Sequence, residues 1–416
     1  MSMETDHGPD QEPEKYSFLQ EKIKDESFSR KNLLYKIPRL VGKGLLFGLA
    51  ASIGFFALKP WAESTFQKNP DKIEIPKDED AQDTAQVDKQ PVQEELTMDN
   101  YKELHALLVQ TASEAKKCVV EISSVRETDN WTQERESSRK KSGVIVADNG
   151  QELLILTDMD VLGEASQLQV RFADNTKCTA TLKQKDANIH MAVIGVERTQ
   201  IKDATWERIK VAELGNSNAM TQGKTVIALG NPFGNSDGMA FGIASSTQQK
   251  VVRADGEYSL LVADMPWSGQ GSGALFNVDG AVVGMIDSEL GADIGVMSAY
   301  GISSIKNEIE MMLNAKKVPY IGILGMQIPD EVAKNQKIPK GFCVTEVEMD
   351  SPAMQAGIQN GDIITHLDKT EIESALSYRS MLIAKEVGTE VVLTGQRRGA
   401  DGYVELRFTV TVGIKE

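Results

Sequence analysis

Hydrophobic and polar positions change their spacing several times along the chain. Residues 40–58 form an almost wholly apolar run that only Lys43 interrupts. From Tyr101 to Lys116 apolar residues recur at helical spacing, which predicts a short amphipathic helix leading into a domain. From Cys118 to about Ile305 short alternating or apolar runs are bounded by Gly, Asn and Asp, which indicates an antiparallel β-sandwich or β-barrel. Examples of the predicted strands are 119–122, 143–146, 153–156, 168–172, 192–196, 224–229 and 281–286.

The apolar run at 40–58 predicts a transmembrane anchor. Its length is near the lower limit for a spanning helix, and the Lys43 side chain can reach the membrane interface. A cleavable signal peptide is the competing interpretation, because the run is short. The long polar region before it and the lack of an A-x-A site after Leu58 favour an uncleaved anchor. Basic residues on its N-terminal side predict a cytoplasmic tail at 1–39 and extracytoplasmic domains beyond the anchor.

Composition limits the function classes. A length of 416 residues is enough for two or three domains, and residues 59–98, which are acidic and rich in Gln and Pro, predict a disordered linker between anchor and domains. A docking site for a basic partner is the alternative interpretation of this acidic segment. The net charge of −16 argues against nucleic acid as a partner. The three cysteines are far apart and lack metal-ligand spacing, so we predict buried thiols, no cofactor and no metal ion.

Five ordered motifs in the predicted β region resemble the HtrA proteases, a family of trypsin-like serine endopeptidases. The motifs cover residues 142–157, 186–194, 214–217, 228–234 and 267–280. The resemblance implies a mostly β fold at 99–314, with two six-stranded trypsin-like β-barrels and an active site in the cleft between them. The same family often forms trimers, so the resemblance also implies a homo-trimer or a hetero-oligomer with an active relative.

Residues 318–416 resemble the PDZ domain that follows the protease in this family. The resemblance assigns Tyr320, Ile321, Gly322 and Ile323 to the carboxylate-binding loop and the strand leading from it, and residues 351–364 match a PDZ signature. A peptide C-terminus would add a strand to an open sheet edge there, while loop N–H groups hold its carboxylate. A side chain at Gly322 is expected to crowd that carboxylate. The resemblance also predicts a helix at residues 374–385, which would form one wall of the peptide-binding groove.

The catalytic positions of the family are occupied by unsuitable residues. Acyl transfer by a serine requires an imidazole to take its proton and a carboxylate to orient the imidazole. In this chain Asp160 stands at the histidine position, His190 at the aspartate position and Gly271 at the serine position. Losing one member of such a triad costs several orders of magnitude in rate. The resemblance therefore predicts an inactive homologue, a pseudoprotease, and restoring all three residues together is expected to revive some activity.

An active serine endopeptidase remains the alternative. Ser272 lies one residue past the expected nucleophile and would have to work with His190, because the other histidines are distant in the sequence. The backbone of Gly269 and Gly271 is expected to shape an oxyanion pocket. Otherwise Ser272 is an ordinary small residue in a Gly-Ser turn.

The exchange of Asp160 and His190 keeps one acid and one imidazole. If the contact survives, an Asp160 oxygen is expected about 3 Å from a His190 ring nitrogen; if the residues drifted independently, the side chains point apart. We interpret the whole chain as a membrane-anchored homologue that binds C-termini or unfolded segments of envelope proteins.

Overall fold

The computed structural model describes residues 71–78, 97–125, 140–163, 167–234, 237–292 and 295–415, together with Ser52. The predicted tail at 1–39 lies outside these residues, as does the predicted anchor at 40–58 apart from Ser52. Across the described ranges, no helix combines the length and apolarity that crossing a bilayer requires.

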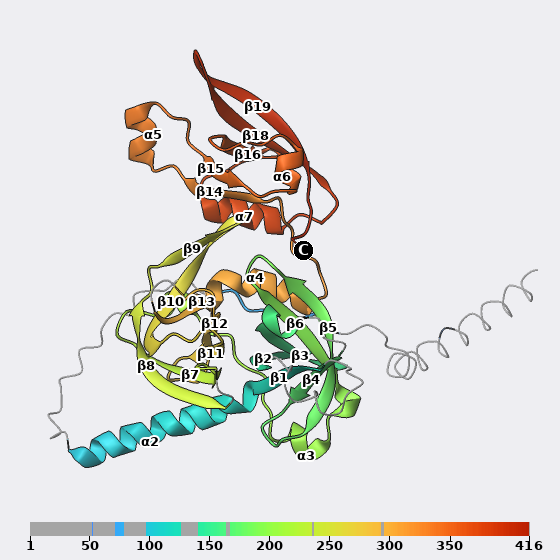
Figure 1. The fold of residues 1–416 in the computed structure, drawn as a ribbon, viewed down its shortest axis with the longest axis vertical. Helices are drawn as coiled ribbons and strands as arrows, with labels where there is room; N and C mark the ends of the chain where they lie inside the picture. The colour runs from blue at the N-terminus through green and yellow to red at the C-terminus, as the bar shows by residue number, and fades with distance from the viewer. Residues whose placement is uncertain are drawn as a thin grey trace, which may run out of the picture. The chain divides into compact units, whose positions relative to one another are not determined.

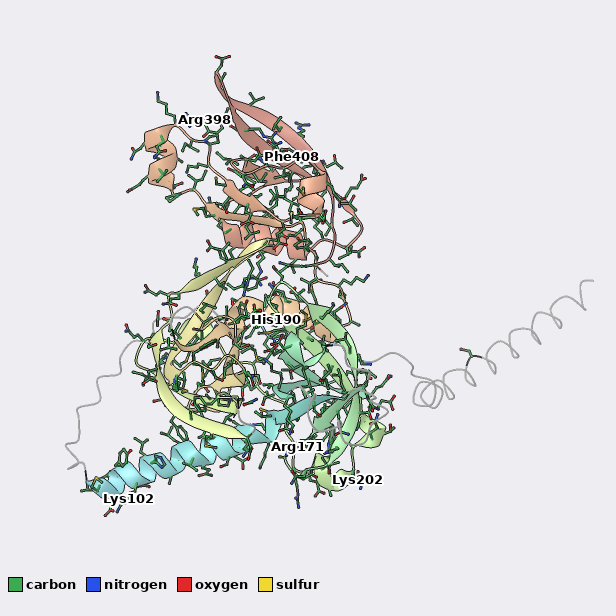
Figure 2. All side chains as sticks on the ribbon, viewed as in Figure 1. Lys102, Arg171, His190, Lys202, Arg398 and Phe408 are labelled. Carbon is green, nitrogen blue, oxygen red and sulfur yellow. The ribbon has the colours of Figure 1, made fainter. Side chains whose placement is uncertain are left out.

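The predicted amphipathic helix is confirmed as α2 (Met98–Ala115). A capping box between Thr97 and Asn100 begins the helix and satisfies its first backbone N–H groups. Only Ala112 and Ala115 are buried, whereas Leu104 and Leu107 are 58% and 55% exposed. The apolar stripe that predicted the helix therefore packs on the domain only at its C-terminal end; Lys102 marks the other end in Figure 2.

The first half of the β region is a closed six-stranded antiparallel barrel (Figure 1). Its strands follow the order β1-β2-β3-β6-β5-β4 around the barrel. Their bounds are β1 (Val119–Val125), β2 (Lys140–Asp148), β3 (Glu152–Asp158), β4 (Gln167–Arg171), β5 (Lys177–Asp186) and β6 (Met191–Glu197). Every residue of β3 after Glu152 is buried, as expected for a strand enclosed by a barrel core and its neighbours. The 3₁₀ helix η2 (Met159–Val161) follows β3 and carries Asp160.

The second half forms another barrel, in the order β13-β12-β11-β7-β8-β10, closed by pairing of β10 with β13. The strand β9 pairs only with β10 and extends that strand into a hairpin. The bounds are β7 (Thr225–Asn231), β8 (Gly238–Ser246), β9 (Lys250–Arg253), β10 (Gly256–Pro266), β11 (Ser272–Phe276), β12 (Val282–Ile286) and β13 (Val296–Gly301). Each example strand predicted from the sequence lies within an observed strand or exceeds its bounds by one residue. The expected pair of six-stranded barrels is confirmed, and β9 is the addition.

The helix α4 (Ile302–Leu313) follows the second barrel and buries one face in the core through Ile305 and Ile309. Residues 71–78 run along this helix: the backbone of Ile73 hydrogen-bonds both ways with the Asn314 side chain, at 3.0 and 2.8 Å. Lys306 Nζ lies 2.7 Å from Asp78 Oδ1. The prediction of a disordered linker is wrong for residues 71–78, because their two isoleucines pack on the core while their backbone groups find partners on α4.

The C-terminal region contains the PDZ sheet, with strands in the order β14-β15-β16-β18-β19 and β17 paired to β16. The elements are β14 (Ile323–Gln327), α5 (Asp330–Gln336), β15 (Phe342–Val347), α6 (Pro352–Gln355), β16 (Ile363–Leu367), β17 (Thr370–Glu371), α7 (Ala375–Ile383), β18 (Glu390–Gly399) and β19 (Gly402–Thr411). The predicted helix at 374–385 is α7, capped by Ser374. Its Tyr378 ring stacks on Phe342 at 4.9 Å in the core.

The three cysteines are free thiols, as the sequence predicts. Cys118 and Cys178 are buried, whereas Cys343 is half-buried. Burial raises the pKa of the Cys118 thiol to about 12, which keeps it protonated and unreactive.

Candidate functional site

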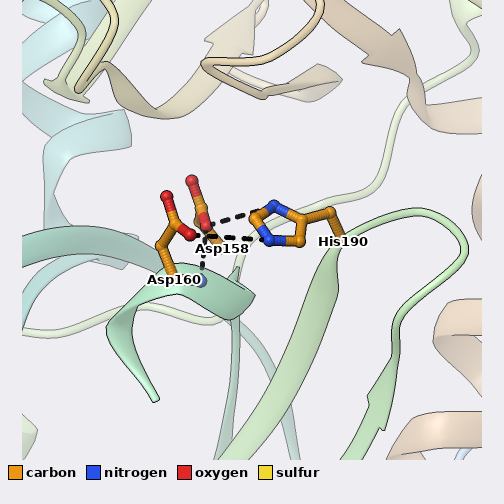
Figure 3. A group of neighbouring side chains, drawn as sticks. All are labelled: Asp158, Asp160 and His190. Atoms are coloured by element: carbon orange, nitrogen blue, oxygen red, sulfur yellow. Dashed lines mark hydrogen bonds and ion pairs between the residues drawn. The ribbon is translucent and has the colours of Figure 1, made fainter. Parts of the chain in front are cut away.

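The exchanged residues Asp160 and His190 face each other in the first barrel (Figure 3), and Figure 2 marks the position of His190 in the fold. His190 Nε2 lies 3.5 Å from Asp160 Oδ1, and His190 Nδ1 lies 3.6 Å from Asp158 Oδ1. The imidazole is therefore held between two carboxylates. The expected hydrogen bond of about 3 Å is wrong, but the two side chains are in contact at the longer distance of 3.5 Å.

Local backbone geometry fixes this arrangement. Asp158 ends β3, and its Oδ1 accepts a hydrogen bond from the backbone N–H of Asp160 at 2.8 Å, which caps η2. The carbonyl oxygen of His190 accepts from the backbone N–H of Met159 at 3.0 Å. His190 itself has a φ of +56°, in the left-handed region that residues other than Gly rarely occupy, although Asn, Asp and His are enriched there. The β5–β6 turn and the β3–η2 junction are thus joined through backbone and side chain.

A buried lysine, Lys141 on β2, forms ion pairs with both carboxylates. Its Nζ lies 2.7 Å from Asp158 Oδ2 and 3.1 Å from Asp160 Oδ2. Burial alone would lower the pKa of Lys141, but the charges and hydrogen bonds of Asp158 and Asp160 outweigh it and raise the pKa. The ammonium therefore stays charged, and Asp160 is occupied by an ion pair as well as by His190. Sequence reasoning missed Lys141, for which no motif gives a signal.

Two more acids reach the same imidazole. The ligand atoms of His190, Asp287 and Glu289 lie within 4.8 Å of one another, as do those of Asp158, Asp160 and His190. Asp287 is buried, and burial raises its carboxyl pKa to about 6. Both groups of side chains have the ligand types of a divalent-cation site. In the group around Asp158, however, a cation would have to compete with the ammonium of Lys141.

The loop at the serine position has no room for a serine in its present conformation. Gly271 is buried, and a Cβ atom added to it would lie 2.7 Å from the carbonyl oxygen of Pro232 and 3.2 Å from that of Ser268. The backbone N–H of Gly271 donates to the Ser268 carbonyl oxygen at 2.9 Å. This N–H is one of those expected to shape the oxyanion pocket, and here it is engaged inside its own turn. The other, at Gly269, belongs to an exposed residue.

Ser272 is a structural residue in this fold. It begins β11, has 0% of its surface exposed, and its Oγ accepts a hydrogen bond from the backbone N–H of Ser142 at 2.9 Å. That contact links β11 of the second barrel to β2 of the first. A hydroxyl in this position is shielded from solvent and from a substrate.

The PDZ loop forms the second part of the site. The backbone N–H groups of Ile321, Gly322 and Ile323 converge on one carboxylate, that of Asp255. Gly322 has a φ of +93°, and a Cβ atom there would collide with Ser351. The glycine is therefore required by its backbone conformation and by Ser351, and the expectation that a side chain would crowd the carboxylate stays a prediction.

Two family models match the chain: a trypsin-like peptidase domain at residues 141–285 and a PDZ domain at residues 319–408. Periplasmic serine endoprotease DegP of Escherichia coli (strain K12) is 28% identical over 276 residues, which are 64% of this chain and 56% of the relative. A probable DegP-like periplasmic serine endoprotease of Rickettsia prowazekii is 30% identical over 287 residues, 66% of this chain and 53% of the relative. The chain thus spans a little more than half the length of these relatives.

Solved structures show the same fold. The HtrA-type protease AlgW with a decapeptide superposes with a TM-score of 0.52 at 21% identity, covering 74% of this chain and 99% of AlgW. A serine endoprotease from Yersinia pestis gives a TM-score of 0.51 at 23% identity, covering 74% and 98%. The architecture is that of a trypsin-like peptidase domain followed by a PDZ domain. The chain is thus a homologue of the DegP-type serine endoproteases over the region it shares with them, with a PDZ domain after the peptidase-like domain.

Proposed function

We propose that this HtrA-type chain is a pseudoprotease, which binds protein segments and does not cleave them. The observation that carries the proposal is the backbone around Gly271. It supplies no hydroxyl, leaves no space for a Cβ atom beside Pro232, and directs its N–H group to Ser268. Covalent catalysis needs a nucleophile and an amide donor at this point, and neither is available.

The charged cluster supports the same function. In a working triad the carboxylate orients an imidazole that faces a serine hydroxyl. Here His190 lies between Asp158 and Asp160, and Lys141 forms ion pairs with both acids. This network joins β2, β3 and the β5–β6 turn, and among the described residues it leaves one buried ring nitrogen, His190 Nδ1, without a hydrogen-bond partner.

The alternative, an active endopeptidase using Ser272 and His190, has less support. The Ser272 hydroxyl oxygen is fully buried and accepts the Ser142 amide, so attack on a peptide would require β11 to separate from β2. No step of acyl transfer can begin from that position.

Binding is assigned to the PDZ loop. Three successive backbone N–H groups that hold one carboxylate have the geometry that captures a peptide C-terminus. Ile321 and Ile323 belong to the apolar cluster beneath the loop, which favours peptides with apolar last residues. The proposed ligands are C-termini or unfolded segments of envelope proteins, since DegP relatives are named periplasmic endoproteases.

The cellular setting is part of the proposal. We infer that residues 40–58 anchor the chain in the cell membrane as a single span, with the N-terminus in the cytoplasm and both folded domains outside. A homo-trimer, or a hetero-oligomer with an active relative, is proposed from the family resemblance alone.

The test compares the full chain in detergent with DegP as an active reference. We expect no casein hydrolysis above background and no labelling by serine-directed phosphonates. Labelling that the substitution Ser272→Ala abolishes would overturn the pseudoprotease assignment and establish the alternative.

A further inference from the structure

The tip of the β9–β10 hairpin places a carboxylate in the PDZ loop. Asp255 Oδ2 accepts hydrogen bonds from the backbone N–H groups of Ile321 at 2.7 Å and Gly322 at 2.8 Å. Asp255 Oδ1 accepts from the backbone N–H of Ile323 at 3.1 Å and from the Tyr378 hydroxyl at 2.8 Å. Asp255 is only 5% exposed. Four donors therefore satisfy a buried carboxylate, which has about four acceptor positions.

The main chain of Asp255 also behaves like that of a bound peptide. Its backbone N–H donates to the carbonyl oxygen of Ile323 at 2.7 Å. Ile323 is the first residue of β14, which is the edge strand of the PDZ sheet. A peptide C-terminus captured by β-augmentation uses its carboxylate on loop N–H groups and its backbone on such an edge. Asp255 makes both kinds of contact.

The backbone conformation and the packing of the hairpin tip favour the contact between Asp255 and the PDZ loop. Asp255 has a φ of +62°, a conformation that aspartate tolerates better than most residues. At the next position, Gly256, a Cβ atom would lie 2.6 Å from the Arg379 side chain. Arg379, on α7, in turn stacks over the Tyr258 ring of β10 at 3.8 Å. The tip thus fits α7 closely only because residue 256 lacks a side chain.

We propose that Asp255 is an internal ligand of the PDZ domain: it fills the carboxylate site in the resting protein, and a peptide C-terminus binds by displacing it. The inference rests on the proposed peptide-binding function and names its regulation. Because only molecules with the tip released can accept a peptide, the apparent affinity falls in proportion to the released fraction. Tethering keeps the internal carboxylate at a high effective concentration, so weak or amidated peptides are excluded.

The first experiment measures peptide affinity by fluorescence anisotropy on the full chain. The probe is a fluorescein-labelled decapeptide ending in Val-Ile-Val with a free carboxylate, and its C-terminal amide is the negative control. Asp255→Asn keeps the side-chain shape but offers an amide N–H₂ to the loop donors. We expect it to bind the probe about tenfold or more tightly than the unmodified chain. The matched control is Glu257→Gln, on the same hairpin, whose carboxylate pairs with Lys250 at 2.9 Å.

The second experiment measures, without any added peptide, whether Asp255 protects the N–H groups of the PDZ loop. Backbone hydrogen exchange at Ile321, Gly322 and Ile323 is expected to be slow in the unmodified chain and in Glu257→Gln, and faster in Asp255→Asn. Asp255→Gly, which suits the positive φ, provides a second variant if the first folds poorly. Equal exchange at these amides, or equal affinity of all variants for the probe, would overturn the internal ligand. Faster exchange without binding of the probe by any variant would uphold Asp255 as the occupant and refute the peptide-binding function.

Discussion

A Cβ atom on Gly271 would lie 2.7 Å from the carbonyl oxygen of Pro232. Such a contact is closer than Cβ atoms in proteins normally make, and its partner is backbone, which cannot rotate away. The chain has therefore lost more than a hydroxyl at the serine position. The turn from Trp267 to Ser272 adopts a conformation that accommodates only glycine at position 271.

This relationship changes the expected outcome of restoring the triad. We predict that Asp160→His, His190→Asp and Gly271→Ser combined give no turnover, because the new serine must displace the Pro232 backbone and Lys141 remains buried beside the site. Overpacking of this kind costs about 1–3 kcal/mol. Peptide hydrolysis and phosphonate labelling check activity, and urea unfolding of Gly271→Ser alone checks the strain. Labelling of residue 271 in the triple variant would show that the turn is pliable.

The buried lysine of the cluster gives a second prediction. Lys141→Met leaves Asp158, which is 6% exposed, without its ammonium partner, and we expect a loss of about 3 kcal/mol in the free energy of unfolding. The neighbouring Lys140 is the matched control, because its side chain is 52% exposed and lies 3.6 Å from Glu121. Lys140→Met should cost under about 1 kcal/mol. Urea denaturation compares the two; equal losses would mean that Lys141 contributes no more than a surface charge.

Much of the architecture could be predicted from the sequence. Alternating runs and turn residues located the strands, since each barrel strand must bury a face in its core and connect through tight turns. The family resemblance supplied the closure into barrels and the positions of Asp160 and His190. It could not supply Lys141, which contacts Asp158 and Asp160 from β2, or Asp287, which lies near His190 just after β12, because no local pattern encodes such contacts.

The Asp255 contact illustrates the same limit more sharply. The sequence Ala254-Asp255-Gly256 is typical of a hairpin turn, and a solvated carboxylate is the ordinary outcome at such a tip. Its three backbone donors lie 66 to 68 residues later in the chain, and the Tyr378 hydroxyl lies 123 residues later. Likewise, Ile73 and Ile75 stand in an acidic segment without periodicity, so their packing on α4 is visible only in the fold.

A third prediction concerns Arg379 of α7 and Glu308 of α4, which form a buried ion pair with an Nε–Oε1 distance of 2.8 Å. Arg379→Met leaves the carboxylate of Glu308, which is 1% exposed, buried without its ion-pair partner. We therefore expect a loss of about 3–5 kcal/mol in the free energy of unfolding. Replacing both residues by methionine should recover part of that loss. The control is Arg407→Met, whose exposed pair with Glu405 spans 3.7 Å. Differential scanning calorimetry measures all three; a shift in Tm no larger than that of the control would contradict the prediction.

The last prediction concerns pH and Asp186, at the end of β5. Its Oδ1 accepts the backbone N–H of Asn188 at 2.8 Å, whereas its buried Oδ2 has no hydrogen-bond partner among the residues that the structure describes. The carboxyl lines a cavity of about 260 Å³ together with Asp255, Glu308 and Arg379. Burial, and then the charge of Glu308, raises the pKa of Asp186 from 3.8 to about 6. Between these two values the folded protein binds more protons at this group than the unfolded chain does.

The free energy of unfolding that Asp186 contributes is therefore fully present below pH 3.8 and is lost as the pH rises towards 6, by about 3 kcal/mol in total. Asp186→Asn cannot ionise and keeps the acceptor for Asn188. We expect the variant to gain stability relative to the unmodified chain across that window and to hold a constant difference above it. Asp401→Asn, in the exposed turn between β18 and β19, is the control. Urea midpoints measured from pH 4 to 8 decide the matter: curves for Asp186→Asn that stay parallel to the unmodified chain would mean that this carboxyl ionises as readily in the fold as in the unfolded chain.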